Sequence, residues 1–322
     1  MNILITEPDF YSHESLEKLS RAGTVWSRNI QSDNELSASM QDTSCDLVFA
    51  KLGLRFDEAL FASAPSLKII ATPTTGLTHI DSKACIEHDI KVISLRNKRE
   101  FLKSITTTAE HIWFLLLSLT RQSSRVQSVI SAGNWSRGGL EITQLSGKKI
   151  GIIGFGRLGE IVADYALAFR TSVTVFDIGE IDPDRIPEGV HVSETLDELL
   201  SVSDFVVLSA SYNGEKILHK GNLPTIKHGA SLINASRGEL VDENVILSML
   251  DEEHLAGYAT DVLDGDSVWN GDEAISSPLF ARARSDHRIY ITPHIGGYAL
   301  DAIRATRSYL VDLVLAELGI VY

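Results

Sequence analysis

The stretch that decides the fold runs from Lys149 to Gly159 and reads Lys-Ile-Gly-Ile-Ile-Gly-Phe-Gly-Arg-Leu-Gly. Its first half is an apolar run of the length of a buried β-strand, and its second half carries three glycines with GxGxxG spacing. The residues after Gly159 have the apolar spacing of an amphipathic helix. A strand, a glycine-rich turn and a helix in this order predict a βα unit that binds the pyrophosphate of a dinucleotide.

The three glycines have different expected roles. Gly154 permits the tight turn, Gly156 lets the backbone approach a pyrophosphate, and Gly159 lets the helix pack against the strand. The helix N-terminus then supplies unpaired N–H groups and a partial positive charge for the phosphates. GxGxxG spacing by itself is a weak signal, so the surrounding strand and helix patterns carry the prediction.

Asp177 ends the next apolar run, 18 residues after Gly159. A carboxylate at this place is expected to accept hydrogen bonds from the adenosine ribose hydroxyls. The residues that follow are acidic, with Glu180, Asp182 and Asp184, and no Arg stands directly after the run. A 2′-phosphate would meet like charges here, so we expect NAD rather than NADP.

Composition narrows the class of protein. The 322 residues have a formal net charge of −14, which argues against a nucleic-acid partner. The longest apolar run, Ile112 to Leu117, is too short to span a membrane. The chain starts without a secretory leader, and Cys45 and Cys85 are its only cysteines, so we expect a cytoplasmic protein with two free thiols. The histidines and cysteines show no metal-ligand spacing, so no metal is expected.

Apolar runs alternate with helical patterns almost throughout the chain. This alternation predicts an α/β protein with two doubly wound parallel sheets. We expect a flavodoxin-like substrate domain over 1–98 and 294–322, with a Rossmann NAD-binding domain over 99–293 inserted in it. Strands are expected at Asn2–Thr6, Asp46–Ala50, Leu67–Thr72, Lys91–Leu95, Lys149–Ile153, Val173–Phe176, Phe205–Ser209, Ser231–Asn234, Gly257–Thr260 and Ile289–Ile291.

An Arg, a carboxylate and a His follow the glycine turn in a fixed order, as Arg237, Asp266 and His294. The forked guanidinium of Arg matches the geometry of a carboxylate. Imidazole exchanges protons near neutral pH, and a carboxylate bonded to it favours the imidazolium and fixes its orientation. These three groups are the ones that a nicotinamide-dependent reduction of a 2-oxo acid requires.

Several longer motifs closely resemble the D-isomer-specific 2-hydroxyacid dehydrogenase family, in particular phosphoglycerate dehydrogenase-like members without a C-terminal regulatory domain. The resemblance covers nearly the whole chain. It rests on TTGLTHID at Thr74–Asp81, TAEH at Thr108–His111, LSGKKIGIIGFGRLG at Leu145–Gly159, INASRGELVDE at Ile233–Glu243, ATDV at Ala259–Val262 and ITPHIGG at Ile291–Gly297.

The resemblance implies roles for single residues. Arg237 would bind the carboxylate and keto oxygen of the substrate, His294 would be the acid/base, and Asp261 would contact the nicotinamide carboxamide. The family's Glu falls on Asp266, which is one methylene shorter, and Asp264 in the same loop is a competing candidate. Further cofactor contacts are expected from Arg157, Leu158, Ala210, Ala235 and His294, and His111 is expected to be structural.

For the substrate, the resemblance points to the backbone N–H groups of Thr75 and Gly76 as carboxylate ligands. Lys51 aligns where some phosphoglycerate dehydrogenases carry a basic residue. The loop 96–103 concentrates four positive charges in an otherwise acidic chain. Either Lys51 or this loop would then recognise a second anionic group of the substrate, although a charge run is more often only a solvated surface.

Three functions stay open at this point. The first is an NAD-dependent D-2-hydroxyacid dehydrogenase acting reversibly on a small 2-oxo or 2-hydroxy acid. The second is D-3-phosphoglycerate dehydrogenase proper, and the third is an NAD(H)-sensing protein that resembles the family's corepressors. A homodimer is expected from the resemblance, with the helix at 106–120 and the segment around Trp135 as candidate interface elements.

Overall fold

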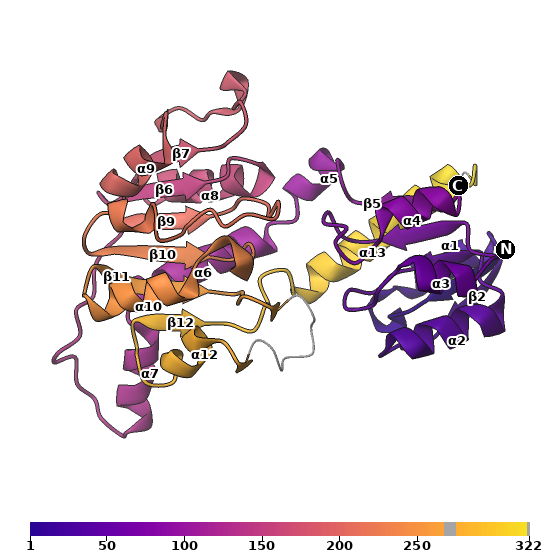
Figure 1. Ribbon diagram of the computed structural model, residues 1–322, viewed down its shortest axis with the longest axis horizontal. Helices are drawn as coiled ribbons and strands as arrows, with labels where there is room; N and C mark the ends of the chain where they lie inside the picture. The colour runs from indigo at the N-terminus through magenta and orange to yellow at the C-terminus, as the bar shows by residue number, and fades with distance from the viewer. Residues whose placement is uncertain (267–274, 321–322) are drawn as a thin grey trace. The chain divides into compact units, whose positions relative to one another are not determined.

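The computed structural model describes residues 1–266 and 275–320, and its contacts divide the chain into two compact units. One unit contains Met1–Ile105 and Tyr298–Tyr322, and the other contains Thr106–Gly297. These divisions lie a few residues beyond those expected after positions 98 and 293. Each unit has its own parallel sheet (Figure 1).

The sheet of the first unit has five strands in the order β2-β1-β3-β4-β5, and all of its pairings are parallel. This is the flavodoxin-like order, which confirms the expected architecture. The strands are β1 (Asn2–Ile5), β2 (Thr24–Ser27), β3 (Leu47–Phe49), β4 (Ile69–Thr72) and β5 (Lys91–Ser94).

Helices cover both faces of this sheet because successive strand residues point to opposite sides. Ile3 and Ile5 pack in a core with α1 (His13–Ser20) and α13 (Leu300–Glu317). Leu4, between them, belongs to the core of the other face. That face carries α2 (Asp33–Thr43), α3 (Glu58–Ser63) and α4 (Ser82–Glu87), while the short α5 (Arg99–Lys103) stacks Phe101 on Tyr309 of α13.

The sheet of the second unit has seven parallel strands in the order β12-β11-β10-β9-β6-β7-β8, and Figure 1 shows those from β12 to β7 side by side. The order reverses between β6 and β9, as in a Rossmann fold, and β12 adds one more strand at the edge. The strands are β6 (Lys149–Ile153), β7 (Ser172–Phe176), β8 (Val190–Val192), β9 (Phe205–Leu208), β10 (Ala230–Asn234), β11 (Leu255–Thr260) and β12 (Ile289–Ile291).

Two buried cores hold the helices of this unit against its sheet. Ile150 and Ile152 of β6 pack with α6 (Thr107–Thr120) and α8 (Arg157–Ala168). Ile153, which points the other way, packs with the helices of the second face. These are α9 (Leu196–Val202), α10 (Glu243–Asp251) and α12 (Pro278–Ala283), while α7 (Ser123–Ser131) follows α6 along the chain. The strand ends at the switch between β6 and β9 are therefore held by two rigid cores.

Candidate active site

The glycine turn has the geometry that a dinucleotide requires. Gly154 has φ +93°, and a Cβ there would lie 2.6 Å from the Cα of Ala210. Gly156 is the N-cap residue of α8, and a Cβ at this position would meet nothing within 4 Å. A Cβ at Gly159 would collide with the carbonyl oxygen of Gly154. The open space at Gly156, at the N-terminus of a helix of 12 residues, fits a pyrophosphate.

Other expected cofactor residues lie around this turn. Arg157 and Leu158 form the first turn of α8. Ala210 and Ala235 follow the carboxyl ends of β9 and β10, which are neighbours in the sheet. These positions share the sheet edge where ligands of open α/β folds bind.

Asp177, directly after β7, is tied to the glycine turn. Its Oδ2 accepts a hydrogen bond from the N–H of Phe155 at 2.7 Å, and its Oδ1 accepts one from Gly179 at 2.9 Å. Arg185 donates to the carbonyl oxygen of Phe155 at 3.3 Å and forms an ion pair with Glu160 of α8. Sequence reasoning missed this guanidinium, because Arg185 is eight positions beyond Asp177.

Arg237 follows β10 in a loop that is tightly hydrogen-bonded. The Asn234 side chain accepts from the N–H of Ser236 at 3.0 Å and donates to the carbonyl oxygen of Arg237 at 2.9 Å. A Cβ at Gly238 would collide with the backbone of Leu263. The loop that carries Arg237 therefore packs directly against the segment that leads to Asp266.

His294 and Asp266 form a hydrogen-bonded pair. The imidazole Nδ1 lies 3.0 Å from the carboxylate Oδ2, with side chains that are 23% and 10% exposed. The competing carboxylate, Asp264, pairs instead with Lys216 at 3.1 Å. The shorter Asp side chain reaches the ring because its loop folds back, with the N–H of Asp266 donating to the carbonyl oxygen of Leu263 at 3.1 Å.

The carboxylate of Asp261 holds the loop that contains His294. It accepts hydrogen bonds from the N–H groups of Ile295 at 2.9 Å and Gly296 at 2.6 Å, and from the Thr292 hydroxyl at 2.5 Å. Burial by itself raises the pKa of Asp261, but the hydrogen bonds from His111, Thr292, Gly296 and Ile295 outweigh it and lower the pKa. The buried carboxylate thus stays charged.

This anchor explains the unusual backbone of His294, which has φ +52°. A non-glycine residue adopts this left-handed conformation only where its surroundings hold it there. The N–H of His294 donates to the carbonyl oxygen of Asp261 at 2.9 Å, and the Asp261 carboxylate holds the two residues that follow. Asp261 therefore positions His294.

His111 of α6 completes this arrangement. Its Nε2 lies 2.8 Å from the Thr292 hydroxyl and 3.2 Å from the Asp261 carboxylate, and its side chain is 12% exposed. From the TAEH motif, His111 was expected to have only a structural role. Its contact with Asp261 joins residues far apart in the chain, and no local spacing signals it.

Apart from Arg237, the expected substrate ligands lie in the first unit. Thr75 and Gly76 are exposed in the loop after β4. Lys51 follows β3, and its Nζ donates to the carbonyl oxygen of Ile30 and to the Gln31 side chain, both at 3.2 Å. The basic segment 96–103 is only partly the loop that was expected, because Arg99–Lys103 form the helix α5, in which Lys103 pairs with Glu100 at 2.9 Å.

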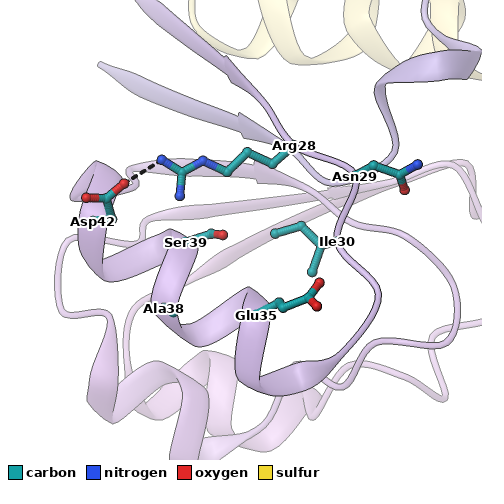
Figure 2. A pocket seen from close by; sticks show the side chains of 7 residues that line it. All are labelled: Arg28, Asn29, Ile30, Glu35, Ala38, Ser39 and Asp42. Atoms are coloured by element: carbon teal, nitrogen blue, oxygen red, sulfur yellow. Dashed lines mark hydrogen bonds and ion pairs between the residues drawn. The ribbon is translucent and has the colours of Figure 1, made fainter.

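A separate pocket in the first unit contains none of the expected site residues. It lies between α2 and the segment after β2, and Figure 2 shows the Arg28 guanidinium reaching Asp42 across it. The side chains that line it are Arg28, Asn29, Ile30, Glu35, Ala38, Ser39 and Asp42. In the described part of the chain, no cluster of three His, Cys, Asp or Glu side chains suits a metal ion, and no helix is long and apolar enough to cross a membrane.

A Rossmann-type unit with an open glycine turn, beside a paired His and carboxylate, defines a dinucleotide-binding oxidoreductase fold. Two family models assign it further. The D-isomer specific 2-hydroxyacid dehydrogenase NAD binding domain matches residues 113–296, and the catalytic domain of the same family matches residues 3–99. The chain belongs to this family.

Relatives with known names agree with this assignment. The chain is 28% identical over 296 residues to D-3-phosphoglycerate dehydrogenase of Bacillus subtilis, covering 91% of this chain and 53% of that protein. It is 30% identical over 282 residues to glyoxylate reductase of Thermococcus gammatolerans, covering 85% of this chain and 78% of that one. The chain therefore spans about half the length of the phosphoglycerate dehydrogenases that it matches.

Solved structures share the fold. D-lactate dehydrogenase of Aquifex aeolicus, complexed with NAD and lactic acid, has a TM-score of 0.82 at 23% identity and covers 99% of this chain and 96% of its own. A 2-hydroxyacid dehydrogenase from Polaromonas has a TM-score of 0.84 at 22% identity and covers 99% of this chain and 97% of its own. The fold and the NAD-binding domain expected from the sequence are thus confirmed.

Proposed function

We propose that this protein is an NAD-dependent D-2-hydroxyacid dehydrogenase that interconverts a small 2-oxo acid and its 2-hydroxy acid. The observation that carries the proposal is the 3.0 Å contact between His294 and Asp266 in the unit that also holds the open glycine turn. In this proposal, one domain carries both the residues for proton transfer and the glycine turn that binds the dinucleotide. Bound NADH supplies the hydride, and the chain supplies the remaining functions.

In the reductive direction, Arg237 binds the substrate carboxylate and keto oxygen through its guanidinium. The charge that develops on the keto oxygen is neutralised by a proton from the His294 imidazolium. Asp266, bonded to Nδ1, stabilises the imidazolium and orients the ring so that Nε2 transfers the proton. In the oxidative direction, the neutral His294 takes the same proton back from the hydroxyl group.

For the cofactor, we infer a preference for NADH over NADPH. The carboxylate of Asp177 is fixed by two backbone N–H groups, so it cannot turn away from a 2′-phosphate without losing them. Arg185, the first cation after Asp177 along the chain, is already paired with Glu160. Titration of intrinsic fluorescence with both cofactors tests this inference, and tighter binding of NADPH would contradict it.

The substrate class is a small 2-oxo acid, as the names of the glyoxylate reductase and D-lactate dehydrogenase relatives suggest. A second anionic group would require a cation near Thr75 and Gly76, which bind the carboxylate in this proposal. Lys51 is the candidate, although it already donates to Ile30 and Gln31. This engagement favours a small acid over 3-phosphohydroxypyruvate, the substrate of D-3-phosphoglycerate dehydrogenase proper.

NADH oxidation with glyoxylate, pyruvate and 3-phosphohydroxypyruvate tests these alternatives. We expect turnover with the small acids and no gain from the phosphate. A preference for the phosphorylated acid that Lys51→Ala removes would identify a phosphoglycerate dehydrogenase instead. Tight NADH binding without reduction of any 2-oxo acid would favour the NAD(H)-sensing alternative, and pull-down experiments with and without NADH would then test it.

We further propose a homodimer formed by the NAD-binding unit. Large apolar side chains are exposed on α6, α7 and the segment after them, and Trp135 is 96% exposed. The others are Phe114, Ile130 and Ile142, each between 45% and 47% exposed. Light scattering should show a dimer that Trp135→Asp weakens. A cytoplasmic location stays a prediction.

A further inference from the structure

A series of hydrogen-bonded side chains connects the end of β4 with the loop that follows it. Nε2 of His79 lies 3.2 Å from the hydroxyl of Thr72, and that hydroxyl lies 3.0 Å from the hydroxyl of Thr74. The Thr74 hydroxyl donates to the carbonyl oxygen of Gly76 at 2.6 Å. Three hydrogen bonds thus link His79 to the middle of the loop.

The direction of these hydrogen bonds follows from the number of protons. A threonine hydroxyl has one proton to donate. Thr74 gives its proton to Gly76, so it accepts from Thr72, and Thr72 in turn must accept from Nε2–H of His79. His79 is therefore the donor at the start of the chain.

The other ring nitrogen leads to the same conclusion independently. Nδ1 of His79 is buried and has no hydrogen-bond partner among the described residues. A neutral imidazole has one N–H donor and one acceptor nitrogen. A buried N–H group without an acceptor is rarer in proteins than a buried acceptor without a donor. Burial also lowers the pKa of His79, which favours the neutral ring. The proton belongs on Nε2.

The ring and the loop ends are held in place. The N–H of Phe56 donates to the carbonyl oxygen of His79 at 2.9 Å, and the two rings meet edge to face with centroids 6.3 Å apart. The N–H of Leu95 donates to the carbonyl oxygen of Thr74 at 3.2 Å. Between these attachments, Thr75 and Gly76 are exposed. The His79 chain fixes the backbone of this exposed part from inside.

We propose that His79 is a positioning residue for substrate binding. Through Thr72 and Thr74 it holds the carbonyl group of Gly76, and this contact restrains the backbone of Thr75 and Gly76, whose N–H groups receive the substrate carboxylate. The inference rests on the proposed function for the identity of the ligand, a 2-oxo acid. It assigns His79 no part in hydride or proton transfer.

The test compares three variants with the wild type. His79→Leu removes the donor, and His79→Gln replaces it with an amide N–H that can reach the same place. His88→Leu is the matched control, because His88 also lies in this unit, pairs through Nε2 with Glu58 at 2.9 Å, and meets Phe61 edge to face at 5.8 Å. Thermal unfolding checks that all variants are folded.

Two measurements are made on these proteins. Nitrogen-15 NMR of labelled histidine, with the His79 signal assigned from the variants, reports which ring nitrogen carries the proton. Calorimetry with oxamate, an unreactive analogue of a 2-oxo acid, reports ligand binding to the NADH-loaded protein. We expect an Nε2–H tautomer, about tenfold weaker oxamate binding in His79→Leu, recovery in His79→Gln, and no change in His88→Leu.

Turnover gives a third readout, because a contact equally strong in ground and transition states changes KM and leaves kcat unchanged. His79→Leu should therefore raise KM for the 2-oxo acid with kcat nearly constant. An Nδ1–H tautomer, or unchanged oxamate affinity in His79→Leu, overturns the proposal. Oxamate binding that depends on His79 without any turnover by the wild type supports the positioning role and refutes the proposed function. Failure of the wild type to bind oxamate overturns both.

Discussion

The imidazole Nδ1 of His294 lies 3.0 Å from the carboxylate Oδ2 of Asp266, across a sequence separation of 28 residues. Two features bring these groups together. Asp261 fixes the left-handed backbone of His294, and the loop that contains Asp266 folds back toward the imidazole ring. A carboxylate bonded to one nitrogen determines which nitrogen of the ring exchanges a proton with a ligand. This relationship gives the site its proposed acid/base function.

Replacing Asp266 by Asn should lower kcat of reduction by about 10²-fold, because the imidazolium loses its negative partner. Asp266→Glu should retain activity, since it restores the family's side chain. Asp264→Asn is the control, because Asp264 pairs with Lys216. Steady-state rates between pH 5 and 9 would measure these effects, and a larger loss at position 264 would contradict the assignment.

Arg237→Lys should lower kcat/KM for the 2-oxo acid by about 10²-fold, because an ammonium cannot form the paired hydrogen bonds of a guanidinium. NADH affinity should remain unchanged. Arg282→Lys, which alters an exposed ion pair with Asp251, serves as the control. Initial rates and NADH titrations distinguish the two effects. Equal kinetics of the Arg237 variant and wild type would exclude Arg237 from substrate binding.

Gly156→Ala should weaken NADH binding by at least about tenfold and leave stability nearly unchanged, because its Cβ meets no protein atom within 4 Å and intrudes only on the ligand. Gly154→Ala should instead lower stability, since φ is +93° and the Cβ would lie 2.6 Å from Ala210. NADH titration and thermal unfolding of both variants test this contrast. Normal NADH affinity in Gly156→Ala would argue against pyrophosphate binding at this turn.

Asp286 should make stability depend on pH. The Arg288 guanidinium, which donates at 2.7 and 3.0 Å, holds the pKa of this carboxyl at about 2. Because the folded-state pKa lies below the unfolded value of about 3.9, the stabilisation is present above pH 4 and is lost as the pH falls toward 2.

Asp286→Asn should therefore destabilise the protein by about 1–2 kcal/mol at pH 7, with the difference from wild type shrinking below pH 4. Urea unfolding at several pH values measures this change. Asp184→Asn provides the comparison, as Asp184 is exposed in the same unit. A destabilisation that is constant down to pH 2 would show that charge is not its cause.

The central strands are buried on both faces, and several of them were predictable from the sequence because they read as continuous apolar runs, as β9 does. Two edge strands were missed. β2 (Thr24–Ser27) and β8 (Val190–Val192) are short and largely exposed, so they carry no such run. The helix α2 was missed as well, because only Leu36 and Met40 give its polar sequence an apolar face.

For the candidate site, motif order indicated Arg237 and His294, and spacing favoured Asp266 over Asp264. The contacts of His111 with Thr292 and Asp261 could not be predicted, since they depend on how α6 packs beneath β11 and β12. The same holds for the Arg185–Glu160 pair, which joins a loop to a helix. Local sequence specifies the reactive side chains, whereas tertiary packing determines what holds them.

The most direct measurement uses pyruvate and NADH as reactants and determines the chirality of the 2-hydroxy acid that is formed. It compares the wild type with His294→Ala. We predict one D-configured 2-hydroxy acid for each NADH oxidised by the wild type, and a rate at least about 10²-fold lower for the variant. Absence of NADH oxidation across the panel of 2-oxo acids, or equal rates for the two proteins, would contradict the assignment of His294 as the acid/base of a 2-hydroxyacid dehydrogenase.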